Sequence, residues 1–580
     1  MIRHAPRPAR AAVAVLAASL PAWGISGTAR AEDRLKELQT EYSTRAEEKV
    51  DRVYHFGSQG PGDVFSNHRS HSNRQIPVYT WGTKADLGLI MGPASSYRDP
   101  EKLRAIYGFL PENTVNPEAE YADQSDIRKV LESAAEKGAK HIFIVWFDGM
   151  DWPATQAAAI VKSRKVYTEG KGSGLIFQDY AAPGSNPQYG WVVTSPTYDR
   201  NQVNVDEQTV TIPANSMKGG YDVTIAGPNP WTPGPHGAKA PGYLKGQGAS
   251  DKDREGVASV GRSLHAYTDS SQSAAEIVSG VKAYNNSVNV ADDGRPVPTL
   301  FHALQERGWK AGTVTSVPFP HASPAGMYAQ NVSREDYQDL GRVMLGLPSI
   351  IHEKRGAPVW PGLDVVMGTG FNTRMEPQHF KRQGENAAEG SIFLSDADRR
   401  TIDVENGGKY TVVETRLGAN GGELLKAAAA EAAEKGTRLF GFFGEKGIDH
   451  LPYRTADNRY DPAPDPVRAG VEPKAATYTQ EQLDSQPTLA QMTDAALRVL
   501  AKPDQKFILF VESGDVDFGL HANNLDVAVG AVHSGEDAIK RIIHWVETNS
   551  NWDDSVMLVS SDHGHYLVID DPAGLLPPPK

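Results

Sequence analysis

Three short runs of consecutive apolar residues stand out along the chain, at residues 142–147, 507–511 and 556–559. Because their hydrophobicity is continuous rather than alternating, each run is typical of a parallel strand covered on both faces. Between them, apolar residues at helical spacing predict helices over residues 124–139, 422–435, 488–501 and 527–548. Strands alternating with helices predict an α/β fold with a mostly parallel sheet.

Two regions depart from this alternation. Residues 170–260 are rich in Gly, Pro, Asn and Ser, with one strand-like stretch at 208–212, and we expect a long insertion outside the sheet. Residues 450–485 are polar and proline-rich, which predicts an excursion on the surface.

Residues 1–31 have the pattern of a secretory signal peptide. A basic start that includes Arg3 and Arg10 precedes an apolar run at 11–20, and Ala29-Arg30-Ala31 is a small-x-small cleavage site. A membrane anchor needs about 20 apolar residues, whereas Pro21 interrupts this run. We therefore expect a periplasmic or secreted protein with no membrane anchor once the signal is removed.

Charge and composition narrow the chemistry. The 580 residues contain 59 Lys and Arg against 72 Asp and Glu, a net charge of −13. This balance argues against a nucleic-acid-binding surface, which needs a basic face. The chain contains no cysteine, so disulfides, zinc–thiolate sites and cysteine nucleophiles are excluded, and any metal site must use His, Asp and Glu.

Acidic residues and histidines follow each predicted strand. They are Asp148 after the first, Glu512, Asp517 and His521 after the second, and Asp562, His563 and His565 after the third. Singly, such residues are usually turn or cap residues. In open α/β sheets, however, ligands bind beyond the carboxyl ends of the strands, so we expect the clusters to converge. Carboxylates with imidazoles suit Zn²⁺, and carboxylates with a hydroxyl suit Mg²⁺.

Ser270 is the candidate nucleophile and Arg334 the candidate phosphate-binding residue. Ser270 lies where a helix is predicted to begin, and the free N–H groups of a helix start favour a phosphate. A serine there is more often only an N-cap. No Ser-His-Asp order is readable, so a metal would have to activate the hydroxyl. The planar fork of Arg334 can bind two phosphate oxygens, although a single exposed Arg is usually a solvated charge.

Taken in order, these motifs resemble those of the alkaline phosphatases. They are Asp148-Gly149-Met150, Thr268-Asp269-Ser270, His321-Ala322-Ser323-Pro324-Ala325-Gly326 with Arg334, Glu512…Asp517…His521, and Asp562-His563-Gly564-His565. The resemblance implies a three-layer sandwich around a mostly parallel sheet. It also implies a secreted hydrolase of small phosphate monoesters with two zinc ions, one magnesium ion and a phosphoserine intermediate.

The resemblance assigns a role to each matching residue. One zinc would take Asp148, Asp562, His563 and the Ser270 hydroxyl; magnesium would take Asp148, Ser323 and Glu512; the other zinc would take Asp517 and His521. Arg334 would bind the substrate phosphoryl group. Asp269, His321 and His565 would lie next to these residues without binding a metal themselves.

One histidine ligand of the family, which follows the Asp-His-x-His motif, is missing after His565. Instead, the N-terminal region resembles the family's C-terminal pattern, with His71 followed by a short polar stretch, an apolar run and Gly82. A later stretch, Asp123-Gln124-Ser125-Asp126-Ile127, resembles the start of the family's closing helix. The resemblance therefore implies a circular permutation in which His71 supplies the ligand, and termini that lie close together permit this. The alternatives are an ordinary loop histidine, or His68 as the ligand.

This interpretation divides the chain into a signal peptide (1–31), an N-terminal segment with the permuted strand and helix (32–139) and a catalytic domain (140–580). Three other functions stay open: a phosphodiesterase, a sulfatase, or a relative that binds metal or phosphate without turnover. A homodimer is possible.

Overall fold

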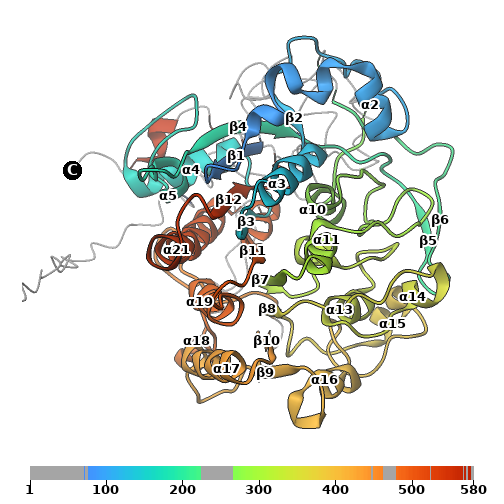
Figure 1. Ribbon diagram of the computed structural model, residues 1–580, viewed down its shortest axis with the longest axis vertical. Coiled ribbons are helices and arrows are strands. Elements are labelled where there is room, and N and C mark those ends of the chain that lie inside the picture. The colour runs from blue at the N-terminus through green and yellow to red at the C-terminus, as the bar shows by residue number, and fades with distance from the viewer. Residues whose placement is uncertain are drawn as a thin grey trace, which may run out of the picture.

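The computed structural model describes residues 76–221, 265–445, 448–460, 478–522, 524–565 and 572–576, and the single positions 35, 71, 73, 223, 567 and 569. The expected signal peptide lies outside the described residues. At the centre of the described chain is a ten-stranded sheet with the order β2-β4-β1-β12-β3-β11-β7-β8-β10-β9 (Figure 1).

Seven neighbouring strands of this sheet run parallel. In spatial order they are β12 (Ser555–Ser560), β3 (His141–Phe147), β11 (Phe507–Ser513), β7 (Lys310–Pro318), β8 (Val365–Thr369), β10 (Arg438–Phe442) and β9 (Tyr410–Glu414). The three apolar runs of the sequence form β3, β11 and β12, which lie side by side, and β3 pairs with both of the others. Because parallel strands end at one edge, the residues that follow these three strands are brought to the same place.

The other end of the sheet is built from the N-terminal part of the chain. β1 (Ile76–Trp81) runs antiparallel to β12, with Tyr79 opposite Val559, and antiparallel to β4 (Gln188–Val193). The two-residue strand β2 (Ala122–Asp123) is parallel to β4. The expected strand after His71 is thus β1, placed beside the last strand of the sheet.

The expectation that residues 170–260 lie outside the sheet is wrong for β4, which is one of its ten strands. The four residues Gly190–Val193 are buried, and the Gly- and Pro-rich sequence around them hides this short apolar run. The strand-like stretch at 208–212 is confirmed as β6 (Thr209–Thr211), which pairs with β5 (Gln202–Asn204) in a separate ribbon.

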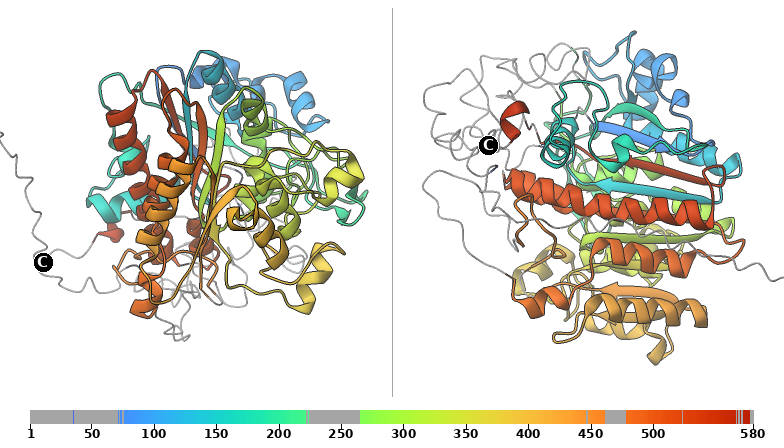
Figure 2. Two further views of the ribbon diagram at one scale, coloured as in Figure 1. Left: turned by 60° about the horizontal axis from the view of Figure 1, so that its bottom comes forward. Right: turned by 90° about the vertical axis from the view of Figure 1, so that its left-hand side faces the viewer.

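Helices cover both faces of the sheet, as the two views of Figure 2 show. One face carries α4 (Trp152–Ser163), α17 (Gly421–Lys435), α19 (Leu489–Leu500) and α21 (Leu525–Asn549). The other carries α3 (Ile127–Glu136), α10 (Ser270–Ser279), α11 (Leu300–Glu306), α12 (Ala322–Tyr328) and α13 (Tyr337–Leu345). Alternate strand residues supply the two cores: Phe143 and Val145 face the first layer, and Ile142 and Ile144 the second. The predicted three-layer α/β sandwich is confirmed.

The predicted helices are confirmed as α3, α17, α19 and α21, with α3 preceded by the 3₁₀ turn η6 (Gln124–Asp126). Further α-helices are α2 (Pro100–Tyr107), α5 (Ile176–Asp179), α14 (Ile350–Arg355), α15 (Pro377–Gln383), α16 (Asp396–Ile402), α18 (Gln480–Asp484) and α20 (Asp515–His521). Part of the expected surface excursion at 450–485, residues 461–477, lies outside the described residues.

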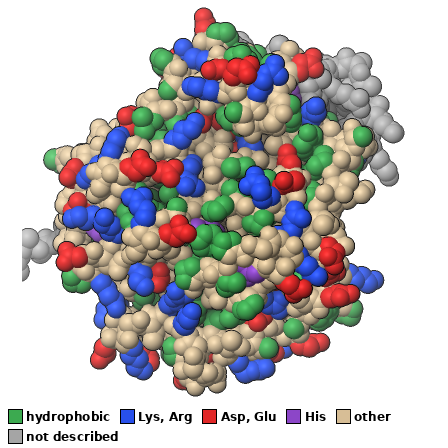
Figure 3. All heavy atoms as spheres, turned by 45° about the vertical axis from the view of Figure 1, so that its right-hand side comes forward, with side chains coloured by type: hydrophobic (Ala, Val, Ile, Leu, Met, Phe, Trp, Pro, Cys, Tyr) green, Lys and Arg blue, Asp and Glu red, His purple; other side chains and the backbone are tan. Residues whose placement is uncertain are grey.

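Two features concern the surface. Within the described ranges, every helix is too short or too polar to cross a bilayer. On the face that Figure 3 shows, basic and acidic side chains are interspersed rather than gathered into a continuous patch of one sign.

Candidate functional site

The three clusters that follow β3, β11 and β12 meet at the carboxyl edge of these strands. The backbone N–H of Gly149 donates to Asp562 Oδ1 at 2.9 Å, and the N–H of Asp148 donates to the carbonyl of Ser513 at 3.3 Å. Residues far apart in the sequence thereby line one site, and their side chains fall into two groups.

The outer donor set consists of His71, Asp517 and His521. The helix α20 presents Asp517 and His521 four residues apart on one face, with Asp517 Oδ1 3.3 Å from His521 Nε2. His71 Nε2 lies 3.2 Å from His521 Nε2 and 3.9 Å from Asp517 Oδ1. His565 Nε2 completes the group at 2.7 Å from Asp517 Oδ1. Its N–H donates to that carboxylate, so His565 holds Asp517 in place.

The inner donor set consists of Asp148, Asp562, His563 and the Ser270 hydroxyl, all buried. His563 Nε2 lies 3.5 Å from Asp148 Oδ1, 3.4 Å from Asp562 Oδ2 and 3.1 Å from Ser270 Oγ. Ser270 Oγ lies 3.5 Å from Asp148 Oδ1. Asp517 Oδ1 lies 3.8 Å from His563 Nε2, so the two sets adjoin.

Both sets fit the donor requirements of zinc. Atoms bound to a tetrahedral Zn²⁺ through bonds of about 2.0 Å lie about 3.3 Å apart, close to the separations within each set. Each set also combines imidazole nitrogen with carboxylate oxygen, the ligands zinc takes when thiolates are absent. Among the described residues, no group hydrogen-bonds to Asp562 Oδ2, which is buried and faces His563 Nε2. A bound cation would satisfy this oxygen.

A third group of oxygen atoms lies behind the inner donor set. Ser323 lies in the first turn of α12, and its Oγ is 3.4 Å from Asp148 Oδ2. Glu512 is fully buried, and its Oε2 accepts a 2.5 Å hydrogen bond from Thr315 Oγ1. Carboxylate and hydroxyl oxygens suit a hard cation such as Mg²⁺. Sequence reasoning missed Thr315, which is one of several polar residues in β7, because its register opposite Glu512 appears only in the folded sheet.

Burial and crowding leave the site electrostatically frustrated without a cation. Burial and the neighbouring carboxylates raise the pKa of Asp148 well above its ordinary value. Burial raises the pKa of Glu512 to about 8 and that of Asp562 to about 6. For Asp517 burial acts the same way, but the surrounding histidines outweigh it and hold the pKa well below the ordinary value.

The site histidines are kept in the form that binds metals. Burial, reinforced by neighbouring histidines, lowers the pKa of His71 and of His563 well below the ordinary value. Both are therefore neutral near pH 7 and offer a lone pair. His563 Nδ1 and His71 Nδ1 lie 3.2 Å and 2.8 Å from the carbonyls of Gly564 and Thr268. A proton on each Nδ1 leaves Nε2 free for a metal.

The metal-free protein should become less stable as the pH rises from about 6.5 to 8. In this range the folded chain keeps the proton of Glu512 while the unfolded chain has released it, so the free energy of unfolding falls as pH increases. Below about pH 6.5 the unfolded chain also binds protons at His71 and His563, which opposes the contribution of Glu512. Urea midpoints in a chelator, measured across this range, test the prediction.

The matched control is the same titration with zinc and magnesium added. A bound cation needs Glu512 deprotonated, so the loss of stability with pH should shrink. It should not vanish, because burial also raises the pKa of Glu276, outside the donor sets, to about 8. Equal slopes with and without metals would contradict this account of Glu512.

A further side of the site is built on α10. Asp269 caps this helix by accepting a 3.1 Å hydrogen bond from the N–H of Gln272, and Ser270 is its first residue. Asp269 Oδ2 also pairs with Arg334 NH1 at 3.3 Å. Arg334 is therefore held beside the helix N-terminus, where an anion would meet both a guanidinium and free N–H groups.

His321 lies on the same side of the site. Burial and the charge of Arg334 lower the pKa of His321 to about 3, so it is neutral. Its ring packs edge-on against Phe518 with centroids 5.8 Å apart. This places His321 as a supporting group.

The N-terminal segment is tied to α10 by buried polar contacts. Lys282 Nζ binds Glu276 Oε2 at 2.6 Å and Asp123 Oδ1 at 3.2 Å, with all three side chains fully buried. Gln124 accepts a hydrogen bond from Ser273 and donates one to the carbonyl of Ser561. The stretch that resembles the start of the family's closing helix thus contacts both α10 and the residue that follows β12.

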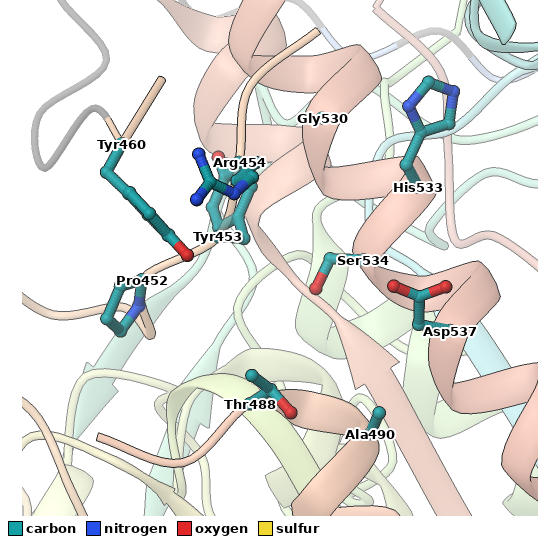
Figure 4. A pocket seen from close by; sticks show the side chains of 10 residues that line it. All are labelled: Pro452, Tyr453, Arg454, Tyr460, Thr488, Ala490, Gly530, His533, Ser534 and Asp537. Atoms are coloured by element: carbon teal, nitrogen blue, oxygen red, sulfur yellow. The ribbon is translucent and has the colours of Figure 1, made fainter. Parts of the chain in front are cut away.

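A separate surface pocket of about 250 Å³ lies along α19, α21 and the loop 452–460 (Figure 4). It is lined by Pro452, Tyr453, Arg454, Tyr460, Thr488, Ala490, Gly530, His533, Ser534 and Asp537. None of the predicted site residues lines it.

Comparison with known proteins identifies related sequences. A family model described as "Alkaline phosphatase" matches residues 256–573. The chain is 26% identical over 317 residues to the alkaline phosphatase of Escherichia coli K12, covering 51% of this chain and 58% of that protein. It is 23% identical over 296 residues to alkaline phosphatase 3 of Bacillus subtilis, covering 51% of this chain and 49% of that protein. The matched part thus spans about half the length of these relatives.

Solved structures give lower similarity. The alkaline phosphatase of Thermus thermophilus aligns with a TM-score of 0.40 and 18% identity, over 74% of this chain and 60% of that chain. The cold-active enzyme of Shewanella sp. aligns with a TM-score of 0.38 and 17% identity, over 73% and 68%. His71 and Asp148 precede the residues that the family model matches, so their assignment depends on the geometry described above.

Proposed function

Because the chain belongs to the alkaline phosphatase family, whose model matches more than half of it, we propose that it hydrolyses phosphate monoesters through a phosphoserine on Ser270. One observation carries the proposal: the Ser270 hydroxyl lies within the inner donor set, 3.1 Å from His563 Nε2. Because Asp269 is the N-cap of α10, capping does not explain why the Ser270 hydroxyl lies beside a buried imidazole and the Asp148 carboxylate.

The residues present fit two zinc ions and one magnesium ion. His71, Asp517 and His521 would hold one zinc; Asp148, Asp562 and His563 the other, with the Ser270 hydroxyl beside them; Asp148, Ser323 and Glu512 would hold magnesium. When bound, these cations offset the charge of a phosphate dianion, lower the pKa of a coordinated hydroxyl or water and stabilise the departing oxygen.

The chain's own residues then perform a double displacement. Arg334, held by Asp269, binds two phosphoryl oxygens and orients phosphorus toward Ser270 Oγ. The Ser270 oxygen forms a bond to phosphorus as the ester P–O bond breaks, and the alcohol leaves with a proton. A water molecule then attacks the phosphoserine, regenerating the Ser270 hydroxyl and releasing inorganic phosphate.

We further propose that the chain is circularly permuted and that His71 is the third protein ligand of the outer zinc. Two observations support this. His71 Nε2 lies in the outer donor set, and β1, which follows it, pairs antiparallel with β12, the strand that precedes Asp562. Secretion and homodimer formation stay predictions; sequencing the N-terminus of the exported protein would test for cleavage before Glu32.

The substrate class is tested by comparing rates on a phosphate monoester, a phosphate diester and a sulfate ester of one leaving group. We expect the monoester to be hydrolysed fastest, because Arg334 and the adjoining donor sets fit a dianion with three free oxygens. A diester or sulfate hydrolysed much faster would refute the substrate assignment. Stoichiometric phosphate binding without turnover, in protein with full metal content, would instead identify a non-catalytic relative.

Arg334→Ala should mainly weaken phosphate binding. Loss of a charge-assisted fork of about 1.5–3 kcal/mol corresponds to roughly 10–100-fold weaker inhibition by inorganic phosphate. Arg334→Lys is the matched control, because it keeps the charge and loses the two-pronged geometry, and we expect an intermediate inhibition constant. Unchanged inhibition in the alanine variant would show that Arg334 does not contact the phosphoryl group.

A further inference from the structure

The side chain of Asn73 bridges two backbone groups just before the nucleophile. Its Nδ2 donates to the carbonyl of Ala266 at 2.9 Å, and its Oδ1 accepts from the N–H of Thr268 at 3.1 Å. The side chain is buried, with the residue 7% exposed. One amide therefore satisfies alternate polar groups of buried backbone that belongs to no strand or helix.

His71, two residues before Asn73, holds the same stretch of backbone. Its Nδ1–H donates to the carbonyl of Thr268 at 2.8 Å, while its Nε2 faces His521. The backbone N–H and carbonyl of Thr268 are thus both bonded to side chains of the N-terminal segment. Thr268 stands two residues before Ser270 and directly before the cap residue Asp269.

Asn73 is in turn anchored to the sheet. Its backbone carbonyl accepts a 3.1 Å hydrogen bond from the N–H of Thr194, which follows β4 directly. The path from β4 through Asn73 to Thr268 therefore holds residues 266–268, the loop that leads into α10 and Ser270, against the end of β4. The same loop fixes the ring of His71 through the carbonyl of Thr268.

We propose that Asn73 is a positioning residue: it holds residues 266–268, which lead into Ser270, in a fixed place relative to the His71 imidazole. Metal binding at the outer donor set and the alignment of Ser270 are thereby coupled. The inference rests on the proposed function. Without the amide, the Thr268 carbonyl is no longer held where it orients the His71 ring. Hydrogen-bond partners of this kind, lying behind a metal ligand, typically change metal affinity by about 10–100-fold.

The experiment compares Asn73→Ala with the full-length wild type by three measurements. Zinc alone is titrated into metal-free protein, the rate of the phosphoserine burst is measured at saturating substrate, and hydrogen exchange is followed at the Thr268 amide. We expect the affinity of the outer donor set for zinc to fall about 10-fold. The phosphoserine burst should slow with little change in KM, and the Thr268 amide should exchange faster.

Gln383→Ala is the matched control. Gln383 is a buried amide with the same two-point geometry: its Nε2 donates to the carbonyl of Ile392 at 2.9 Å and its Oε1 accepts from the N–H of Gln338 at 2.8 Å. It lies in α15, and its side-chain contacts, with Gln338, Met375 and Ile392, include no residue of either donor set. Its loss should lower stability and leave zinc affinity and the burst unchanged.

Each outcome decides the proposal. Wild-type zinc affinity and burst rate in the Asn73→Ala protein would overturn it, as would equal effects of the Gln383 variant. If Asn73→Ala does not fold, Asn73→Ser is measured in the same way, and unchanged zinc affinity there overturns the proposal too. A wild type that binds two zinc ions but forms no phosphoserine refutes the proposed function alone, because the zinc and exchange measurements still test the coupling. A wild type that binds no zinc refutes both.

Discussion

Replacing Ser270 by alanine should abolish the covalent phosphoenzyme while leaving metal content unchanged. The hydroxyl is the only part of the inner donor set that the substitution removes, and Asp148, Asp562 and His563 remain to bind the ion. Turnover should fall by a factor on the order of 10³ or more, because a water molecule would have to replace the positioned nucleophile. Acid quenching with a phosphorus-labelled substrate detects the phosphoserine, and metal analysis of the same sample shows whether the site is filled.

The control for this substitution lies at the far end of the same helix. Ser279 is the last residue of α10, and within the described part of the chain its hydroxyl hydrogen-bonds only to the backbone of Val281. Ser279→Ala should retain both the trapped intermediate and the turnover rate. A phosphoenzyme that survives in the Ser270→Ala protein would place the nucleophile elsewhere and refute the assignment.

Replacing His71 by alanine should reduce the zinc content from about two ions to about one per chain. The outer donor set would keep Asp517 and His521 as ligands, with His565 hydrogen-bonded to Asp517. A zinc site that loses one of three protein ligands binds far more weakly. Zinc is measured after dialysis against a buffer of fixed free zinc concentration, and turnover is measured on the same protein.

His68→Ala is the control that tests the register of this segment. Position 68 lies outside the described residues, whereas His71 Nε2 is 3.2 Å from His521 Nε2. We expect the His68 variant to keep both zinc ions. Retention of both ions by the His71 variant would defeat the proposed permutation, and loss of zinc in the His68 variant alone would shift the ligand by three residues.

The sequence predicted the centre of the fold better than its edges. β3, β11 and β12 are continuous apolar runs because helices cover them on both faces, and their parallel arrangement explains why the residues that follow them converge. β4 was missed because only four of its residues are buried, within a Gly- and Pro-rich region. Local composition there says little about a strand that is held mainly by its neighbours.

The residues of the site likewise divide into those that the sequence predicted and those that it could not. Asp148, Glu512 and Asp562 could be predicted because each lies at or just beyond the end of a recognisable strand. Thr315 and Asn73 could not, because their roles depend on partners far along the chain. Thr315 supports Glu512 across a strand pair, and Asn73 binds backbone 193 and 195 positions away. No periodicity or motif records such a contact.

The pairing of β1 with β12 has a consequence for how the molecule is made. His71 and His521 are 450 positions apart in the sequence. β1, the first strand of this sheet along the chain, pairs with β12, the last along the chain. A ribosome delivers the N-terminal partner long before the C-terminal one, and such high contact order slows folding. The outer donor set therefore cannot assemble until Asp517 and His521 have been synthesised, late in translation.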